Sequence, residues 1–313
     1  MFAVIGEALL DLVQGEPAGP FVAKPGGGPL NIAVGLARLD HPTELKARLS
    51  TGQLGAVLRE HAEANGVGLR TCVETPDQTT LAFASLDEQR RASYEFYVKG
   101  TADWAWTSEE LADLPPEAMA VHTGSLAAAI APGADAILAL WGGLAGDGRL
   151  LLSFDPNIRP ALARDREAAV SRVERFVTSS HVVKASDEDL RWLYPDDSSA
   201  DILARWSALG PELVVMTRGA DGCVAIKADA EPVELPGRQV DVVDTIGAGD
   251  AFESGLLSGL DDSDALTPGA VAKLDVDALF AVLQRAIDVS AMTCERPGAD
   301  PPTRSQYDDM RSA

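Results

Sequence analysis

The sequence predicts an α/β fold in which a mostly parallel sheet is covered by helices on both faces. From Met119 onward, short apolar runs alternate with longer segments of helical composition, which is typical of parallel sheets with helical crossovers. Polar residues gather after successive apolar runs, at residues 155–159, 184–189, 217–218 and 244–250. Because ligands of open α/β sheets bind beyond the carboxyl ends of the strands, the sequence predicts one ligand crevice at that edge.

The N-terminal part of the chain begins with an apolar run at residues 2–5, which predicts a buried parallel strand. A glycine triplet at 26–28 then precedes an apolar, small-residue run at 32–39. This is the pattern of a loop that brings the backbone close to a ligand before a helix begins. Residues 54–65 predict a further helix, which ends at Gly66.

Strand composition returns at residues 79–86 and 92–98, with a polar turn at 87–91 between them. This pattern predicts a hairpin of short strands inserted into the alternating order. Such an insertion suits a lid that closes over a substrate and excludes water. The alternative is an extra sheet that merely packs on the edge of the molecule.

The remaining elements continue the alternation. A second hairpin is predicted at 223–227 and 232–235, and an apolar run at 239–243 leads into the glycine-rich turn. Predicted strands lie at 120–123, 150–154, 181–183 and 213–216, and predicted helices at 134–144, 167–178, from 190 onward, 202–209, 251–260 and 278–293.

Composition limits the classes of function. The 313 residues are 46% hydrophobic, enough for one large domain or one domain with a small appendage. The net charge of −22 argues against nucleic acid and anionic membranes as partners, because both are polyanions. It is compatible with a nucleotide whose phosphates are neutralised by Mg²⁺ and backbone amides. The four histidines show no metal-ligand spacing. The three cysteines form no CxxC motif, which is typical of free thiols in a reducing compartment. Together with the lack of a leader and of a transmembrane-length apolar run, this predicts a cytoplasmic protein.

The turn at residues 244–250 carries the strongest chemical signal. Gly247 and Gly249 flank Ala248, and the carboxylate of Asp250 follows at the start of an apolar helical run. Amides at the start of a helix form an anion site. An anion site beside a carboxylate suits phosphoryl transfer to a hydroxyl, in which the amides hold the phosphoryl charge and the carboxylate takes the proton.

Two residues nearer the N-terminus suit the other substrate of such a reaction. Asp11 interrupts an apolar stretch, and its partner is either backbone N–H groups or the hydroxyls of a polar ligand. Asn31 follows the glycine triplet and can both donate to and accept from sugar hydroxyls. Neither GxGxxG after the first strand nor GxxxxGK[ST] occurs, which argues against a Rossmann dehydrogenase and a Walker-type site.

These motifs resemble the ribokinase-like (PfkB) carbohydrate kinases over nearly the whole chain. Residues 244–250 match the family's DTxGAGD signature, and residues 26–33 match its N-terminal glycine signature. Residues 6–13 and 154–159 are similar to the fructokinase and ketodeoxygluconate kinase branches. The resemblance implies a ribokinase-like three-layer α/β/α sandwich. It implies a single kinase domain over 1–313, with a small β-sheet lid inserted at about 70–100.

The resemblance also implies roles for particular residues. Asp250 would be the catalytic base, and the amides of Gly247, Ala248 and Gly249 would form the anion hole. ATP would be bound by Lys184, Thr217, Gly219, Gly222, Gly247 and Gly249. The sugar would be bound by Asp11, Gly27, Gly28, Asn31, Phe96, Tyr97 and Arg159. Mg²⁺ would bridge the phosphates mostly through water, with Asp189 as the nearby carboxylate, and K⁺ would bind near Asp244 and residues 296–298.

Three departures from the family pattern narrow the expectation. Ser186 stands where the family often has Asn, and Gln53 lies in a stretch that lacks a usual Asp. Val98 stands where acid-sugar kinases commonly carry Arg, which favours a neutral sugar. The leading hypothesis is an ATP-dependent fructokinase that makes fructose 6-phosphate and forms a homodimer through its lid strands. The alternatives are a ketodeoxygluconate kinase, a kinase for a nucleoside or other ribose-type substrate, and a non-catalytic sugar or nucleotide sensor.

Overall fold

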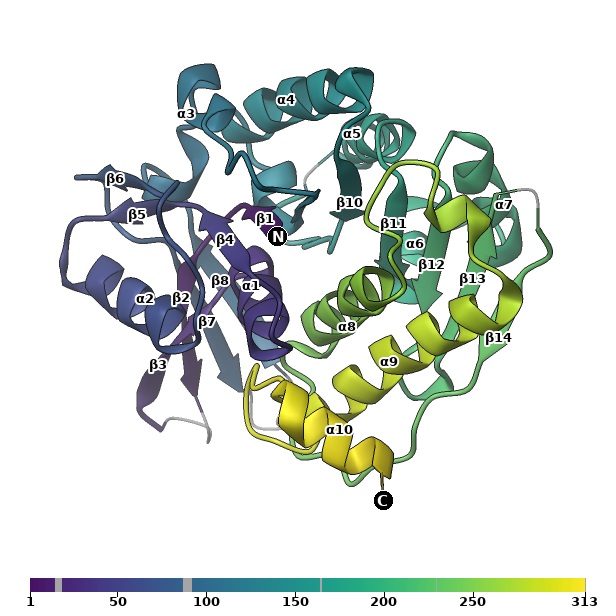
Figure 1. Ribbon diagram of the computed structural model, residues 1–313. Helices are drawn as coiled ribbons and strands as arrows, with labels where there is room; N and C mark the ends of the chain where they lie inside the picture. The colour runs from purple at the N-terminus through teal and green to yellow at the C-terminus, as the bar shows by residue number, and fades with distance from the viewer. Residues whose placement is uncertain (15–18, 87–91, 164, 229, 313) are drawn as a thin grey trace.

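The computed structural model describes residues 1–14, 19–86, 92–163, 165–228 and 230–312. Its centre is an eight-stranded sheet in the order β14-β13-β12-β11-β10-β9-β1-β4 (Figure 1). The strands from β12 to β4 are parallel, and β13 and β14 add an antiparallel hairpin at one edge. The strands are β1 (Phe2–Ile5), β4 (Thr43–Lys46), β9 (Ala120–Gly124), β10 (Leu151–Asp155), β11 (Val182–Ser186), β12 (Leu213–Thr217), β13 (Cys223–Lys227) and β14 (Val233–Leu235).

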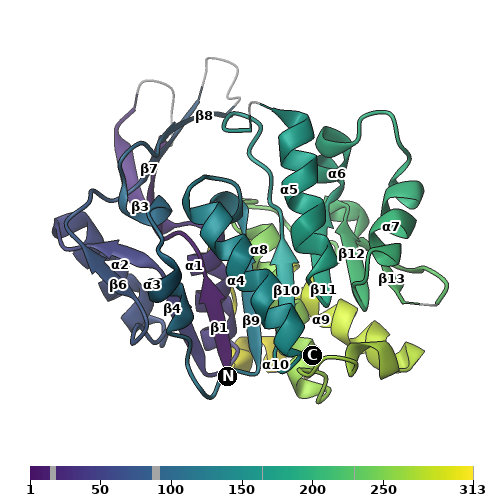
Figure 2. The same cartoon turned by 90° about the horizontal axis from the view of Figure 1, so that it is seen from above.

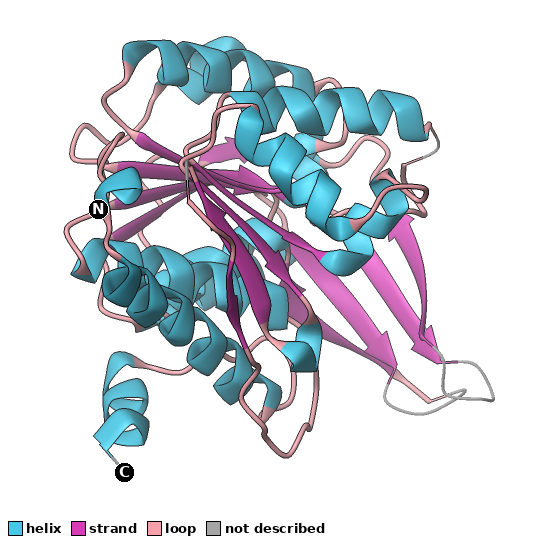
Figure 3. Cartoon of the chain, turned by 90° about the vertical axis from the view of Figure 1, so that its right-hand side faces the viewer, coloured by secondary structure: helices cyan, strands magenta, loops and turns pink. Residues whose placement is uncertain are grey.

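Helices cover both faces of this sheet, which confirms the predicted α/β class (Figures 2 and 3). Because side chains alternate along a strand, Phe2 and Val4 join one apolar core with α1, α2, α8 and α9, whereas Ala3 and Ile5 join a second core with α4 to α7. The helices are α1 (Gly28–Arg38), α2 (Gln53–Ala64), α3 (Ser108–Ala112), α4 (Gly133–Asp147), α5 (Arg166–Thr178), α6 (Asp187–Leu193), α7 (Ser199–Ala208), α8 (Ala248–Asp262), α9 (Val276–Cys294) and α10 (Arg304–Ser312). None of the helices in the described ranges is long and apolar enough to cross a membrane.

A second, four-stranded sheet forms the lid, in the order β3-β2-β7-β8. Strands β7 (Leu81–Leu86) and β8 (Ala92–Tyr97) form the antiparallel hairpin that the sequence predicts; the predicted turn at 87–91 lies outside the described residues. Strands β2 (Leu9–Gln14) and β3 (Phe21–Gly26) complete the sheet and were not predicted. Two separate segments of the chain therefore build this sheet, which projects from the body of the molecule (Figure 3). Strands β5 (Arg48–Ser50) and β6 (Val73–Thr75) pair separately.

The apolar run at 239–243 is not a strand, so the polar cluster at 244–250 does not follow a strand end as expected. Val242 and Val243 are each 62% exposed. The amides of Val243 and Asp244 donate to the carbonyl oxygen of Cys294 rather than to a neighbouring strand. The glycine-rich turn is instead positioned by α8. Helix α9 packs closely on α8 because Gly255 has no side chain; a Cβ there would lie 2.8 Å from the Cα of Ala286.

Candidate active site

A cavity of about 600 Å³ lies at the carboxyl edge of the parallel strands, between the central sheet and the lid. It is the crevice that the sequence predicts at this edge. Its walls come from the segment after β1, the glycine loop, the inner face of the lid, the segments after β9, β10 and β11, and the first turn of α8. The predicted site residues that line it are Asp11, Gly27, Gly28, Asn31, Phe96, Arg159, Asp189, Gly247, Ala248, Gly249 and Asp250.

The turn into α8 has the geometry of an anion site. Gly247 adopts left-handed backbone angles with φ 76°, and the helix begins at Ala248. The N–H groups of Gly249 and Asp250 lie in the first turn, where no preceding carbonyl of the helix can accept from them. The ammonium nitrogen of Lys184 lies 3.6 Å from the position of a Cβ at Gly249. Backbone amides and a buried cation therefore meet at the same turn, which favours binding of an anion.

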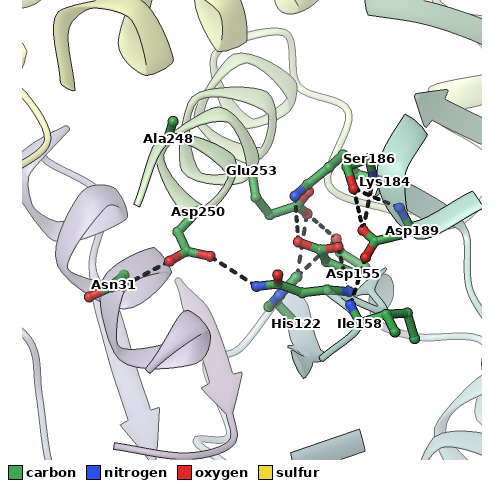
Figure 4. A network of polar contacts seen from close by, with 12 residues as sticks. Asn31, His122, Asp155, Ile158, Lys184, Ser186, Asp189, Ala248, Asp250 and Glu253 are labelled. Atoms are coloured by element: carbon green, nitrogen blue, oxygen red, sulfur yellow. Dashed lines mark hydrogen bonds and ion pairs between the residues drawn. The ribbon is translucent and has the colours of Figure 1, made fainter. Parts of the chain in front are cut away.

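Asp250 lies in this turn with its carboxylate held from two sides (Figure 4). The Nδ2 group of Asn31 donates to Oδ2 at 2.8 Å, and the Nδ2 group of Asn157 donates to Oδ1 at 3.4 Å. Burial raises the pKa of Asp250, and the Asn31 hydrogen bond and the positive charge of Lys184 lower it by less, so that the pKa stays above its usual value. A raised pKa makes the carboxylate a better proton acceptor. Asn157 was not predicted as a site residue, although it lies in the polar stretch after β10.

The sugar side of the cavity is rich in carboxylates. Asp11 has a pKa raised to about 6, mainly by burial and then by the charge of Asp250. Arg159 is the one lysine or arginine among the described residues that line the cavity, and its guanidinium donates to the Oδ1 atom of Asn157 at 2.6 Å. Three acidic residues, Glu7, Asp11 and Asp250, line this side, and Glu188 and Asp189 line the cavity at the start of α6. This electrostatic environment disfavours a negatively charged substrate on the sugar side.

The lid separates the two aromatic residues that the sequence placed together. Phe96 faces the cavity, whereas Tyr97 is 52% exposed and its ring centroid lies 5.2 Å from that of Phe83. Adjacent residues of a strand point to opposite faces, so the two cannot both contact a ligand under the lid. Tyr97 therefore lies on the outer face of the lid and does not line the cavity, and its sugar contact stays a prediction.

The residues expected to bind ATP are spread over β11, the end of β12 with the turn that follows it, and the turn into α8. Lys184 is 3% exposed and forms an ion pair with Asp155 instead of lining the cavity, because it lies inside β11 and faces α8. Thr217 ends β12, and Gly219 and Gly222 form the tight turn before β13 with φ angles of 55° and 86°. These three residues do not line the described part of the cavity. Their ATP contacts stay a prediction.

The two carboxylates expected near metals lie apart and are already hydrogen-bonded. The Oδ1 atom of Asp189 accepts from the amide of Ile158 at 2.8 Å, and its Oδ2 atom accepts from the hydroxyl of Ser186, the N-cap residue of α6. Asp244 accepts from the amides of Ile246 and Gly298, which brings it to residues 296–298 as the resemblance implies. No group of three or more His, Cys, Asp or Glu in the described ranges is arranged to hold a metal ion.

The sequence did not predict a buried polar cluster that lies between the sheet and the second turn of α8. His122, Ser153 and Glu253 are each 1% exposed or less and come from β9, β10 and α8. The Oγ atom of Ser153 donates to Oε1 of Glu253 at 2.5 Å. The available signal in the sequence was a charged residue one helical turn after Asp250, on the same face of an otherwise apolar helix.

Comparison with known proteins gives the family. Residues 1–305 match the model of the pfkB family carbohydrate kinases. A fructokinase from Rhizobium leguminosarum bv. trifolii is 36% identical over 284 residues, which cover 89% of this chain and 85% of the relative. The structure of a fructokinase with bound ATP from Xylella fastidiosa superposes with a TM-score of 0.89 at 26% identity and covers 100% of this chain and 99% of the other.

A fructokinase double mutant from Vibrio cholerae O395, in the form that binds fructose, ADP and potassium, has a TM-score of 0.84 at 25% identity. The match covers 98% of this chain and 97% of that structure. The family model and the relative both cover most of the chain, and the two structures share its fold. The chain therefore belongs to the PfkB family of carbohydrate kinases.

Proposed function

We propose that this protein is an ATP-dependent fructokinase that transfers the γ-phosphoryl group of ATP to the 6-hydroxyl of fructose. The observation that carries the proposal is Asp250, a buried carboxylate of raised pKa at the first turn of α8, beside backbone amides and inside the lid-covered cavity. Relatives named fructokinase bind ATP in one structure and fructose, ADP and potassium in another. Such an enzyme would act in the cytoplasm, where ATP is available.

In the proposed reaction, each residue of the site has a physical role. Asp250 accepts the proton of the sugar hydroxyl as the hydroxyl oxygen bonds to the γ-phosphorus and the bond to the β-phosphate oxygen breaks, which releases ADP. Asn31 and Asn157 fix the two oxygens of Asp250, so the carboxylate is oriented before the sugar binds. The first-turn amides of α8 hold the phosphoryl charge. Mg²⁺ supplies further neutralisation of the phosphates, and K⁺ near Asp244 would fix the turn.

The charge of the cavity supports a neutral sugar over an acidic one. On the sugar side, Glu7, Asp11 and Asp250 face the single guanidinium of Arg159 among the described residues. That guanidinium already donates to Asn157, and Val98 supplies no second cation at the lid. A ketodeoxygluconate carboxylate would have to enter this environment with few cations to pair with.

A substrate panel tests the function directly. With ATP, Mg²⁺ and K⁺, we expect turnover of fructose with a kcat/KM about 10²-fold above that for 2-keto-3-deoxygluconate, a ratio worth about 2.7 kcal/mol. Coupled detection of ADP across hexoses, pentoses, nucleosides and keto-acids measures this ratio. Preference for the keto-acid or a nucleoside would reassign the substrate, and binding of sugar and ATP without turnover would identify a sensor.

The outer face of the lid is the proposed dimer surface. Phe21 and Tyr97 are 43% and 52% exposed and lie on the face of the lid sheet opposite the strand positions that line the cavity. The rings of Phe21 and Phe83 are in edge contact at 5.3 Å, so this face presents contiguous apolar area, and such area marks an interaction site. A second copy of the chain is the proposed partner.

We expect Tyr97→Glu to convert a dimer into a monomer, because it places a charge in the centre of this apolar face. Light scattering coupled to size-exclusion chromatography measures the mass. Phe280→Glu is the matched control, since Phe280 is 41% exposed on α9, away from the lid. A wild-type monomer, or a Tyr97→Glu dimer, would exclude this surface as the interface.

A further inference from the structure

Directly below Asp250, α8 carries a second buried carboxylate. Glu253 follows one helical turn later and is 0% exposed. Its Oε1 atom accepts from Ser153 at 2.5 Å and lies 3.3 Å from Nδ1 of His122. No residue in the described ranges hydrogen-bonds its Oε2 atom. Figure 4 shows Asp250 and Glu253 projecting from the same helix toward the sheet, with His122 and Lys184 on either side of Glu253.

This arrangement is costly if it serves packing alone. A buried carboxylate with one unpartnered oxygen loses hydration that its hydrogen bonds only partly replace. Burial raises the pKa of Glu253, but the hydrogen bond from His122 and the charges of His122 and Lys184 lower it below its ordinary value, so the side chain is ionised. Leu256 and Leu257 fill neighbouring buried positions of α8 with apolar atoms. A charge at position 253 therefore points to an electrostatic role.

Lys184 and His122, the two basic residues around Glu253, also act on Asp250. The charges of Lys184 and His122 each lower the pKa of Asp250, which weakens it as a base. Lys184 is paired with Asp155 on β10 and is also stabilised in its charged form by Glu253. Glu253 thus offsets positive charge that Asp250 would otherwise experience more strongly.

Other charged groups face Asp250 from the elements around it. Asp11 on β2 and Arg159 after β10 interact with it electrostatically. Glu7, after β1, lines the same cavity and is buried. None of these three groups contacts Glu253, His122 or Ser153 in the described structure, so substitutions in the buried cluster leave their own contacts intact.

We propose that Glu253 is a positioning residue of the kinase site, which holds His122 in place and balances the charge of Lys184 so that this charge does not weaken Asp250 as the proton acceptor. The inference rests on the proposed function, because it assigns Asp250 the role of base. It adds a residue that touches neither sugar nor nucleotide and acts only through the groups behind the turn.

Glu253→Gln tests the proposal, because glutamine has nearly the same volume and keeps an oxygen that accepts from Ser153. In the wild type, activity is lost as the pH falls through the pKa of Asp250. Without the negative charge of Glu253, the positive charge of Lys184 lowers that pKa further, so we expect the acidic limb of kcat/KM for fructose to move down by about one pH unit. We also expect kcat on the plateau to fall about tenfold, because Asp250 is a weaker base, and KM for fructose to change less than about twofold, because no sugar contact is altered.

Two further variants separate charge from packing. His122→Gln removes the positive charge of His122, which lowers the pKa of Asp250. The acidic limb of kcat/KM for this variant is therefore expected to move in the opposite direction, to higher pH. Ser153→Ala removes a hydrogen bond to Glu253 without changing any charge, and its limb is expected to stay in place. Asp11 also titrates near pH 6, but its interactions with Asp250 and Arg159 are the same in all four proteins.

The outcomes are distinguishable. An acidic limb that stays in place in Glu253→Gln, with only the thermal stability changed, overturns the inference and leaves the proposed function standing. If Glu253→Gln does not fold, the His122→Gln profile decides, and a limb unmoved or shifted to lower pH rejects the inference. Absence of turnover in the wild type with every sugar tested rejects the proposed function, and the inference with it.

Discussion

Asp250→Asn is expected to lower kcat with fructose by about 10²–10⁴-fold, the usual contribution of a positioned general base. Asparagine matches the shape of the carboxylate and keeps an oxygen that can accept from Asn31, so the cavity stays intact. It cannot take a proton from the sugar hydroxyl. ATP affinity is expected to stay within about threefold, because the first-turn amides of α8 that hold phosphate are unchanged.

The measurement is steady-state turnover with fructose, together with calorimetric titration of ATP. Asp147→Asn is the matched control, since Asp147 ends α4 with a half-exposed side chain and pairs only with Arg149 among the described residues. Turnover of Asp250→Asn within about tenfold of the wild type would remove Asp250 from the role of base. Loss of ATP binding together with turnover would show instead that the substitution disturbs the anion site.

The central sheet could be predicted from the sequence because its strands are buried on both faces. Residues 2–5 and 213–216 are continuous apolar runs, and parallel strands between two layers of helices need such runs. The turn at 244–250 and its anion site could also be predicted, since a tight turn that exposes its amides requires glycines at fixed positions. The crevice followed from the topology alone, because parallel strands present their carboxyl ends at one edge.

Two features of the lid could not be predicted from the sequence: strand β3 and the orientation of Tyr97. Strand β3 contains a lysine, a proline and a glycine and is largely exposed, so its composition resembles a loop; pairing with β2 makes it a strand. The orientation of Tyr97 depends on the register of β8, and a shift of one residue would exchange it with Phe96. A motif names both residues, but only the three-dimensional pairing decides which one faces the sugar.

The buried cluster around Glu253 was missed for a different reason. His122, Ser153 and Lys184 come from three neighbouring strands, and each lies in a short apolar run where a single polar residue carries little signal. The register that pairs His122 with Ser153 brings them together under α8. Contacts between residues 31 to 100 positions apart in the chain arise from tertiary structure and leave no local pattern.

Gly247→Ala is expected to reduce kcat/KM for fructose by about 10–10²-fold, although it adds only a methyl group. Gly247 has a φ of 76°, a left-handed conformation that costs other L-residues about 1 kcal/mol or more. An added Cβ would also lie 2.5 Å from the Cβ of Ala299 and 2.9 Å from its Cα. The start of α8 or the segment around Ala299 must therefore move, and a displacement of about 1 Å at a reacting group costs about 10²-fold.

The same movement would reach the expected potassium site, because Gly298 donates its amide to Asp244 at 2.8 Å. We therefore expect the K⁺ concentration for half-maximal activity to rise together with the loss of kcat/KM, which a titration of K⁺ at fixed ATP and fructose measures. Gly146→Ala is the control, since its added Cβ meets nothing within 4 Å and alanine favours a helix. Wild-type kinetics in Gly247→Ala would mean that the turn tolerates a side chain and that catalysis does not depend on its left-handed geometry. A loss of kcat/KM with unchanged K⁺ dependence would instead confine the effect to the amides and carboxylate of α8.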